Sequence, residues 1–338
     1  MAIKVKAKIS QESSAPLAGE CLVEAECLIV EQCAVAEERL AEVIEQSELI
    51  NEPFTVEDVS TFLDIDWKDL PEHTADSTDN EAEPHTAEVV DLTKLGWHSP
   101  SYSTSRSVTL DPETLQTNRC IAFEGDMATI DSYKVIRARI LERMKSSNGN
   151  TLMVTSVLPG EGKTTTAINL AFIMAKEFQQ TVLLVDCDLQ QQDIHKRLGY
   201  QSDKGLINYL LDDVPLPELF TWPGVEKITL ISGGRTIRDS SELLGSPRMK
   251  ELVTDMKTRY PNRFVIFDMQ STFAGADTLV FSPLVDNILL VIQEGNSSTK
   301  DIKRAISLLP EDKLLGLMLN RHKAASHIVT RSGSQRNG

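Results

Sequence analysis

A glycine-rich segment between a predicted strand and a predicted helix most constrains how this chain folds. The segment, residues 159–165, reads Pro-Gly-Glu-Gly-Lys-Thr-Thr. An apolar strand is predicted before it at 151–156, and a helix after it from residue 163 to about 177. Glycines let backbone N–H groups turn towards phosphate oxygens, and a helix N-terminus adds partial positive charge. The segment in this setting predicts a phosphate-binding P-loop.

The chain around this segment has the alternating pattern of an α/β protein. The predicted strands lie at 151–156, 181–185, 228–232, 264–268, 287–292 and 314–320, and the predicted helices at 131–145, 163–177, 194–198, 206–211, 247–260 and 299–309. Several strands are nearly continuous apolar runs, which is typical of strands covered on both faces. We therefore predict an α/β fold with a doubly wound, mainly parallel sheet, that of a P-loop NTPase.

The side chains of the P-loop predict ATP and Mg²⁺ as cofactors. Lys163 supplies a full charge for the β- and γ-phosphates, and Thr164 offers a hydroxyl to Mg²⁺. A dinucleotide-binding loop is excluded because its third glycine is missing. Val157 stands where the strict pattern has its first glycine, which points to a subfamily. The loop residues predicted to bind the nucleotide are Pro159, Gly160, Glu161, Gly162, Lys163, Thr164 and Thr165.

Three carboxylates follow two of the predicted strands. Asp186 and Asp188 come after one strand, and Asp268 comes after another. A lone aspartate in such a place usually forms a turn, but the carboxyl ends of parallel strands meet at one edge of the sheet. We therefore predict that all three lie near the phosphates, with Asp186 and Asp268 joining Thr164 at the metal. The predicted catalytic residues are Lys163, Asp186, Asp188 and Asp268.

Charge divides the chain into two parts. Residues 1–130 hold 27 acidic and 8 basic side chains, whereas the rest of the chain holds 23 and 26. The formal net charge of −16 argues against nucleic acid as a partner. No apolar run approaches 18 residues, so no direct membrane insertion is expected. Five scattered cysteines suit a reducing compartment, and we predict a cytoplasmic protein.

The excess of acidic side chains in residues 1–130 also guides the predicted domain organisation. The division is an acidic, partly helical N-terminal region at 1–70, a flexible linker at 71–109, the P-loop domain at 110–321 and a disordered tail at 322–338. A short edge strand is predicted at 3–9. Apolar residues at spacings of three, four and seven predict one or two amphipathic helices over about 20–50. Such a helix either docks a partner or packs on its own neighbour, and the sequence leaves both open.

Three stretches resemble a known family, the bacterial tyrosine kinases of exopolysaccharide and capsule synthesis. They are residues 155–171, 182–189 and 239–247, and the resemblance covers about residues 110–320. The family belongs to the wider group of partitioning and cell-division P-loop ATPases. The resemblance implies an ATP-dependent protein-tyrosine kinase, often acting on its own kind. It further implies recruitment to the inner face of the cell membrane by a membrane polysaccharide co-polymerase or chain-length protein.

The resemblance also assigns roles to individual residues. The family's Glu-x-x-Arg-x-x-Arg helix, tied to oligomerisation, here carries Asp131, Lys134 and Arg137, which implies a homo-oligomer through this helix. An ordinary solvated helix face is the alternative. Relatives of the fold often recognise the base at the end of the last strand, where Asn320 and Arg321 stand. A simple turn at the strand end is the alternative there.

Three departures from the family pattern keep other functions open. Gln190 stands where the family has an arginine after its acidic pair, and Met269-Gln270-Ser271 replaces the usual x-Pro-Pro after the second acidic strand. No tyrosine follows Asn320, although family kinases often carry a C-terminal tyrosine cluster. Tyrosine kinase remains the main hypothesis. The alternatives are an ATPase switch and a nucleotide-binding adaptor without kinase activity.

Overall fold

A computed structural model describes residues 2–7, 25–31, 105–120, 127–177, 180–260 and 262–322 of the 338-residue chain. Its strands are β1 (Ala2–Ala7), β2 (Ala25–Glu31), β3 (Arg106–Ser107), β4 (Thr151–Ser156), β5 (Thr181–Asp186), β6 (Thr221–Trp222), β7 (Ile228–Ile231), β8 (Arg263–Asp268), β9 (Asn287–Gln293) and β10 (Leu314–His322). Its α-helices are α3 (Pro112–Thr117), α4 (Met127–Ser146), α5 (Lys163–Met174), α6 (Ile194–Leu198), α7 (Leu206–Asp212), α8 (Ser240–Leu244), α9 (Pro247–Arg259), α10 (Asp277–Phe281) and α11 (Thr299–Leu308). Short 3₁₀ helices lie at η3 (Leu216–Leu219), η4 (Ser282–Leu284) and η5 (Glu311–Lys313).

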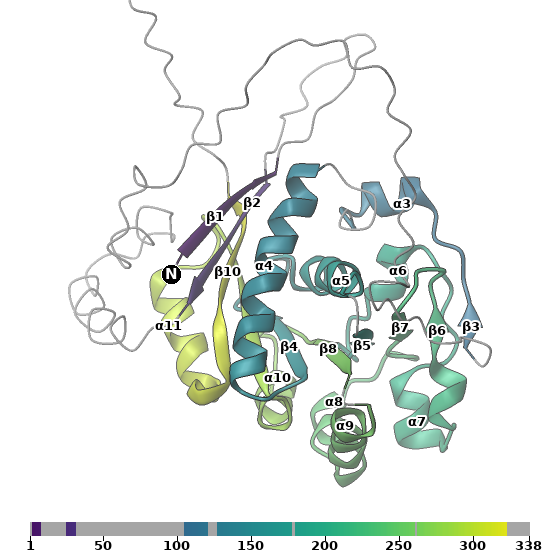
Figure 1. Cartoon of the computed structure of the whole chain (residues 1–338). Coiled ribbons are helices and arrows are strands. Elements are labelled where there is room, and N and C mark those ends of the chain that lie inside the picture. Colours follow the sequence, from purple (N-terminus) through teal and green to yellow (C-terminus); the bar gives the residue numbers. More distant parts are fainter. Residues whose placement is uncertain are drawn as a thin grey trace, which may run out of the picture.

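The described strands form one sheet in the order β1-β2-β10-β9-β4-β8-β5-β7-β6-β3 (Figure 1). The six neighbours from β10 to β7 are parallel throughout. β2 pairs antiparallel with β10 and with β1, and β6 pairs antiparallel with β7. The fold is therefore the predicted α/β fold with a mainly parallel sheet. Because β4 lies between β8 and β9, the loop after β4 leaves the middle of the sheet.

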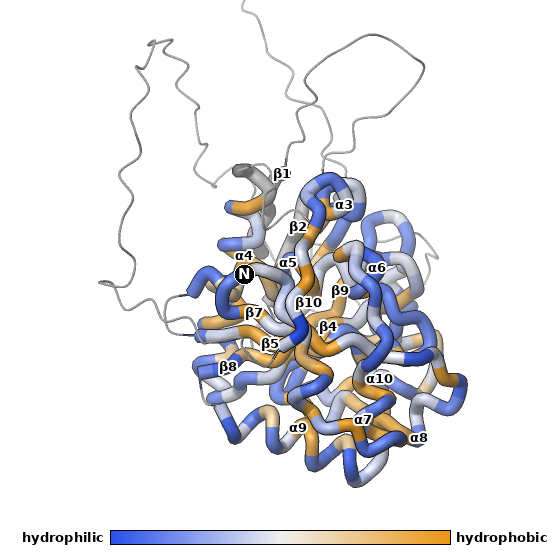
Figure 2. Tube along the Cα trace, turned by 90° about the vertical axis from the view of Figure 1, so that its right-hand side faces the viewer, coloured by the Kyte–Doolittle hydropathy of each residue, from blue (hydrophilic) through white to orange (hydrophobic). Residues whose placement is uncertain are grey.

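Helices cover both faces of the sheet, and the strands alternate between them. On one face, Leu152 and Val154 of β4 pack in a core with Ile140 of α4 and Phe172 of α5. On the other face, Met153 of β4 belongs to a second core, whose members include the following residues of β5, α9 and α11: Leu183, Val185, Leu252, Val253, Ile302 and Ala305. Figure 2 shows hydrophobic colour along β4 and β9 inside a more hydrophilic periphery. Burial on both faces explains why these strands read as continuous apolar runs.

The elements predicted between residues 131 and 320 are confirmed, with ends that shift by a few residues. One example is α9, which starts at Pro247 as expected. The hydroxyl of Ser246 accepts a hydrogen bond from the Met249 N–H and caps this helix. Apart from β2, the α-helices and strands that the sequence did not predict are short: α3, α8, α10 and the two-residue strands β3 and β6. Too few residues form each of them for a period to show.

The N-terminal prediction is half right. The edge strand predicted at 3–9 is confirmed as β1, at one end of the sheet. The helix predicted over 20–50 is wrong for residues 25–31, which form β2 and pair with β10 through the register Val30 to Leu317. Pairing satisfies backbone groups of the β10 edge, and the run Cys-Leu-Ile-Val suits a strand as well as a helix. The rest of that predicted helix lies outside the described residues.

Three further expectations concern the linker, the C-terminal tail and membrane insertion. Arg106–Ser107, near the end of the predicted linker, pair with β6 as β3. Most of the linker and the tail after His322 lie outside the described residues, so the domain division stays a prediction. No described helix combines the length and apolarity needed to cross a bilayer.

Candidate active site

Backbone geometry builds the P-loop at the start of α5. Gly160 and Gly162 have φ angles of 86° and 97°, in the left-handed region that favours glycine. Gly162 is also the N-cap of α5. A Cβ atom at Gly162 would lie only 2.1 Å from the Asn320 side-chain nitrogen, so a side chain here would displace Asn320. The two glycines let the chain turn sharply into the helix, as a phosphate cradle requires.

Glu161 holds the loop from inside the protein. Its buried carboxylate accepts hydrogen bonds from the Leu158 N–H at 2.8 Å, the Gln293 N–H at 3.2 Å and the Ser297 hydroxyl. Its carbonyl oxygen accepts one from the Asn320 side-chain amide at 2.8 Å. The Glu161 side chain therefore fixes the loop to the end of β9, and its carbonyl oxygen joins the loop to β10. Only its backbone is left for the predicted contact with a nucleotide.

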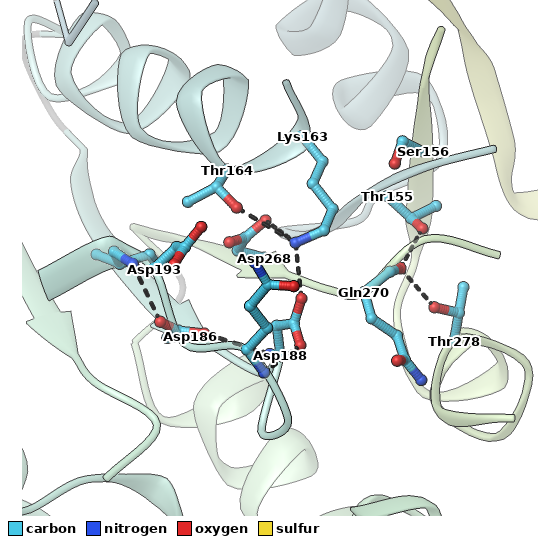
Figure 3. A network of polar contacts seen from close by, with 12 residues as sticks. Thr155, Ser156, Lys163, Thr164, Asp186, Asp188, Asp193, Asp268, Gln270 and Thr278 are labelled. Atoms are coloured by element: carbon cyan, nitrogen blue, oxygen red, sulfur yellow. Dashed lines mark hydrogen bonds and ion pairs between the residues drawn. The ribbon is translucent and has the colours of Figure 1, made fainter. Parts of the chain in front are cut away.

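Lys163 lies among the predicted carboxylates. Its Nζ atom is 2.8 Å from Asp188 Oδ2, 3.9 Å from Asp268 Oδ1 and 3.3 Å from the Thr164 hydroxyl (Figure 3). Burial by itself would lower the pKa of Lys163, but the charges of Asp268 and Asp188 outweigh it and leave this pKa raised. The lysine is therefore charged at neutral pH. The phosphates of a bound nucleotide would compete with Asp188 for this ammonium group.

The two aspartates at the ends of β5 and β8 have different surroundings. Asp186 accepts hydrogen bonds from the N–H groups of Asp188 at 3.3 Å and Ile194 at 3.2 Å, so its position is fixed by backbone. Burial, and next the charge of Asp268, raise the pKa of Asp186 well above its usual value. Burial also raises the pKa of Asp268 to about 6, although the charge of Lys163 offsets part of this rise.

Asp268 fits a role at a metal. It is fully buried, and neither of its carboxylate oxygens accepts a hydrogen bond from a described residue. Within the described part of the chain, no three His, Cys, Asp or Glu side chains form a metal cluster. Mg²⁺ suits such a site because it keeps several waters and needs only one or two protein oxygens besides the phosphates. Asp268 and Thr164 are the residues that would hold it, and the part of Asp186 at the metal stays a prediction.

The remaining predicted site residues lie at the rim of the loop. Pro159 and Gly160 are exposed at its tip. Asn320 contacts the loop through Glu161, as described above. Arg321 is exposed, has a φ of 57° and donates a hydrogen bond to the Gln293 side chain at 2.9 Å. Both predicted base-recognition residues therefore lie beside the P-loop, while their role remains a prediction.

Two features near the site escaped sequence reasoning. Arg197 of α6 donates a hydrogen bond to the Thr165 hydroxyl at 3.0 Å, yet a single arginine in a short helix gives no motif. Gln190, at the family's arginine position, donates to the Ser240 hydroxyl at 2.9 Å, which in turn donates to Asp277 at 2.5 Å. Burial raises the pKa of Asp277, while the Ser240 hydrogen bond lowers it in part. Gln190 therefore closes a polar network between α8 and α10.

The helix predicted as a subunit contact is α4. Lys134 and Asp131 pair with each other at 2.7 Å, and their side chains are 42% and 59% exposed. Arg137 is held within its own subunit: it pairs with Glu177 at 3.0 Å and donates to the Ile173 carbonyl at 2.9 Å. Arg137 thus supports the end of α5, and of the three predicted contact residues Asp131 and Lys134 are the exposed ones.

Comparison with known proteins agrees with this geometry. Residues 152–333 match the model of the CobQ/CobB/MinD/ParA nucleotide binding domain. Tyrosine-protein kinase YwqD of Bacillus subtilis (strain 168) is 30% identical over 215 residues, which cover 63% of this chain and 90% of that protein. The succinoglycan biosynthesis transport protein ExoP of Rhizobium meliloti (strain 1021) is 25% identical over 185 residues, or 53% of this chain and 23% of that protein.

A solved structure supports the same assignment. The chimerical protein CapA2B2 superimposes with a TM-score of 0.56 at 25% identity, covering 69% of this chain and 97% of that one. The chain covers 90% of the length of YwqD but only 23% of the length of ExoP. On the combined sequence, fold and site, this chain belongs to the bacterial tyrosine kinases within the MinD/ParA family of P-loop nucleotide-binding proteins.

Proposed function

We propose that this protein is an MgATP-dependent protein-tyrosine kinase that regulates exopolysaccharide or capsule synthesis or export. The observation that carries the proposal is the placement of the Lys163 ammonium between Asp188 and Asp268 at the mouth of a P-loop. Lys163 and the loop amides would stabilise the charge of the transferring phosphoryl group. Thr164 and Asp268 would hold Mg²⁺, which would supply further stabilisation of phosphate charge.

The proposed reaction is phosphoryl transfer to a tyrosine of another subunit or another protein. The bond between the γ-phosphorus and the bridging oxygen of ATP breaks, and a bond from that phosphorus to the tyrosine oxygen forms. The phenolic proton goes to Asp186 or Asp188, and ADP leaves with the bridging oxygen. The raised pKa of Asp186 supports this residue as a proton acceptor, because a more basic carboxylate takes a proton more readily.

The setting of the reaction is also part of the proposal. The relatives' names link them to tyrosine phosphorylation and to succinoglycan biosynthesis transport. We therefore propose a cytoplasmic protein that a membrane polysaccharide co-polymerase or chain-length protein recruits to the inner face of the membrane. Self-association would use the exposed Asp131 and Lys134 of α4.

A second candidate is an ATPase switch without protein phosphorylation, and the Gln190 network favours it. An arginine at this position would bring a positive charge next to the acidic pair. Here the uncharged amide of Gln190 instead donates a hydrogen bond to Ser240. Under this alternative, a water molecule replaces the tyrosine as the phosphoryl acceptor, and ATP turnover drives a change in subunit contacts.

One experiment tests the kinase against its rivals. The full chain is incubated with Mg²⁺ and ATP labelled at the γ-phosphate, and label is measured on protein tyrosine and as free phosphate. Label on tyrosine that disappears in Lys163→Met supports the kinase. Free phosphate without protein label supports the switch, and neither product supports a nucleotide-binding adaptor. Protein labelling that survives Lys163→Met would refute the proposed mechanism.

A further inference from the structure

Three arginines come from chain segments that contact α5 or the P-loop. Arg119 follows α3, Arg197 is in α6 and Arg321 is near the end of β10. Thr165, which contacts Arg197, comes two residues after Lys163, and two residues turn an α-helix by about 200°. The hydroxyl of Thr165 and the ammonium of Lys163 therefore lie on different sides of the P-loop.

Hydrogen bonds hold Arg197 and the backbone of Arg119 against α5, and Arg321 is next to a residue bound to the P-loop. Arg197 donates to Thr165 at 3.0 Å, and its carbonyl accepts from the Asn118 side chain at 2.9 Å. The carbonyl of Arg119 accepts from the side chain of Asn169, in α5, at 2.9 Å. Arg321 follows the residue that binds the Glu161 carbonyl. Three arginine-bearing segments that are distant in sequence thus meet near the P-loop and α5.

Carboxylates balance this charge only in part. The ion-pair partner of Arg197 is Asp193, at a distance of 3.8 Å, and the Arg197 Nε atom is buried without a hydrogen-bond partner among the described residues. Within the described ranges, Arg119 and Arg321 form no ion pair. The like charges also act on one another, since burial and then the charges of Arg119 and Arg197 lower the pKa of Arg321. An anionic ligand would relieve this repulsion.

We propose that Arg119, Arg197 and Arg321 bind the α-phosphate and ribose end of the nucleotide, an inference that rests on the proposed nucleotide binding. Lys163 and the metal take the β- and γ-phosphates, so the α-phosphate is the next anionic group along the ligand. Thr165 lies in the first turn of α5, where N–H groups and the helix dipole favour that phosphate. Guanidinium suits it because its planar donors match two phosphate oxygens at once.

Calorimetry with three ligands tests this assignment: MgATP, MgADP and magnesium pyrophosphate, which lacks the nucleoside and its α-phosphate. Arg197→Gln should weaken MgATP and MgADP binding by about tenfold or more, the effect of losing a charged hydrogen bond. Pyrophosphate binding should change by less than about threefold, because Lys163 is untouched. Arg119→Gln and Arg321→Gln should each weaken nucleotide binding severalfold. Lys196→Gln, which removes an exposed charge beside Arg197, is the matched control.

The outcomes separate this inference from the proposed function. A wild-type protein that binds no MgATP refutes both. If the wild type binds MgATP and all three arginine variants bind it equally well, the arginine site is refuted while nucleotide binding stands. An equal loss for pyrophosphate and MgATP also overturns it, since the arginines would then act on the whole loop. If Arg197→Gln melts early, the exposed Arg119 and Arg321 variants decide the question.

Discussion

The two sides of the P-loop differ in charge, in burial and in the way their residues are held. On the aspartate side, Asp186, Asp188 and Asp268 follow two parallel strands and are almost entirely buried. On the arginine side, Arg119, Arg197 and Arg321 come from a loop, a short helix and a strand end, and are more exposed. The buried side suits charge chemistry that must exclude water, whereas the open side suits a ligand that enters and leaves. The start of α5 thus lies between a buried side suited to phosphate chemistry and an open side suited to ligand exchange.

Lys163→Met should break the aspartate side and have the largest effect. The variant leaves Asp188 and Asp268 without their buried counter-charge, so we expect a loss of about 3 kcal/mol in the free energy of unfolding at neutral pH. MgATP affinity should fall by about 100-fold or more. Denaturant titration and calorimetry measure the two effects. Lys196→Met, on an exposed side chain of the arginine side, should change neither, and an equal loss there would contradict the distinction.

Asp268→Asn should sharpen the comparison because its two effects have opposite signs. Turnover of MgATP should fall by about 100-fold, since the metal loses a carboxylate. Nucleotide-free protein should become more stable near neutral pH. The folded-state pKa of Asp268, about 6, lies above the ordinary aspartate value of 3.8. Burial of its charge therefore costs stability fully above about pH 6 and not at all below about pH 4.

Melting temperatures of wild type and Asp268→Asn across pH check the second effect. The gain should be full above about pH 6 and should disappear below about pH 4. Asp255→Asn, which removes a carboxylate paired with Arg259 on the surface, is the control and should change stability little at any pH. A gain that does not vary with pH would show that the charge of Asp268 is not its cause.

Glu161→Ala should weaken both sides together, because this residue holds the loop that lies between them. Its loss leaves the Leu158 and Gln293 N–H groups without their acceptor, and we expect a loss of about 2 kcal/mol in stability. Affinities for pyrophosphate and for MgADP should fall by similar factors, unlike in the arginine variants. Glu311→Ala, an exposed residue in η5, is the comparison. A loss confined to one of the two ligands would argue against a shared role.

Lys134→Gln should have the smallest effect, since it lies outside both sides. Its exposed ion pair with Asp131 contributes less than about 0.5 kcal/mol to stability. Light scattering should show weaker self-association if α4 forms the subunit contact, while nucleotide affinity stays unchanged. Unchanged self-association would remove Lys134 from the proposed interface. Arg137→Gln should instead lower stability, because Arg137 is bound to Glu177 and to the end of α5.

The sequence was most informative where one local pattern contains both the structure and the chemistry. Gly162, Lys163 and Thr164 are contiguous, and the flanking strand and helix are long enough for their periods to show. Asp186, Asp188 and Asp268 were placed at one edge because parallel strands end together. The same reasoning failed for residues 25–31, where a short apolar run fits helix and strand alike and the open edge of β10 decided for a strand.

Sequence by itself determined the α/β class, the position of the P-loop and the identity of the acidic residues that face it, because these depend on patterns of neighbouring residues. Tertiary structure alone decided that the Glu161 side chain turns inward, that Gln190 binds Ser240 and that Arg197 binds Thr165. The physical reason is that each of these contacts joins segments far apart in the chain. No local spacing encodes such a contact, and packing of the two layers of helices on the sheet brings the partners together.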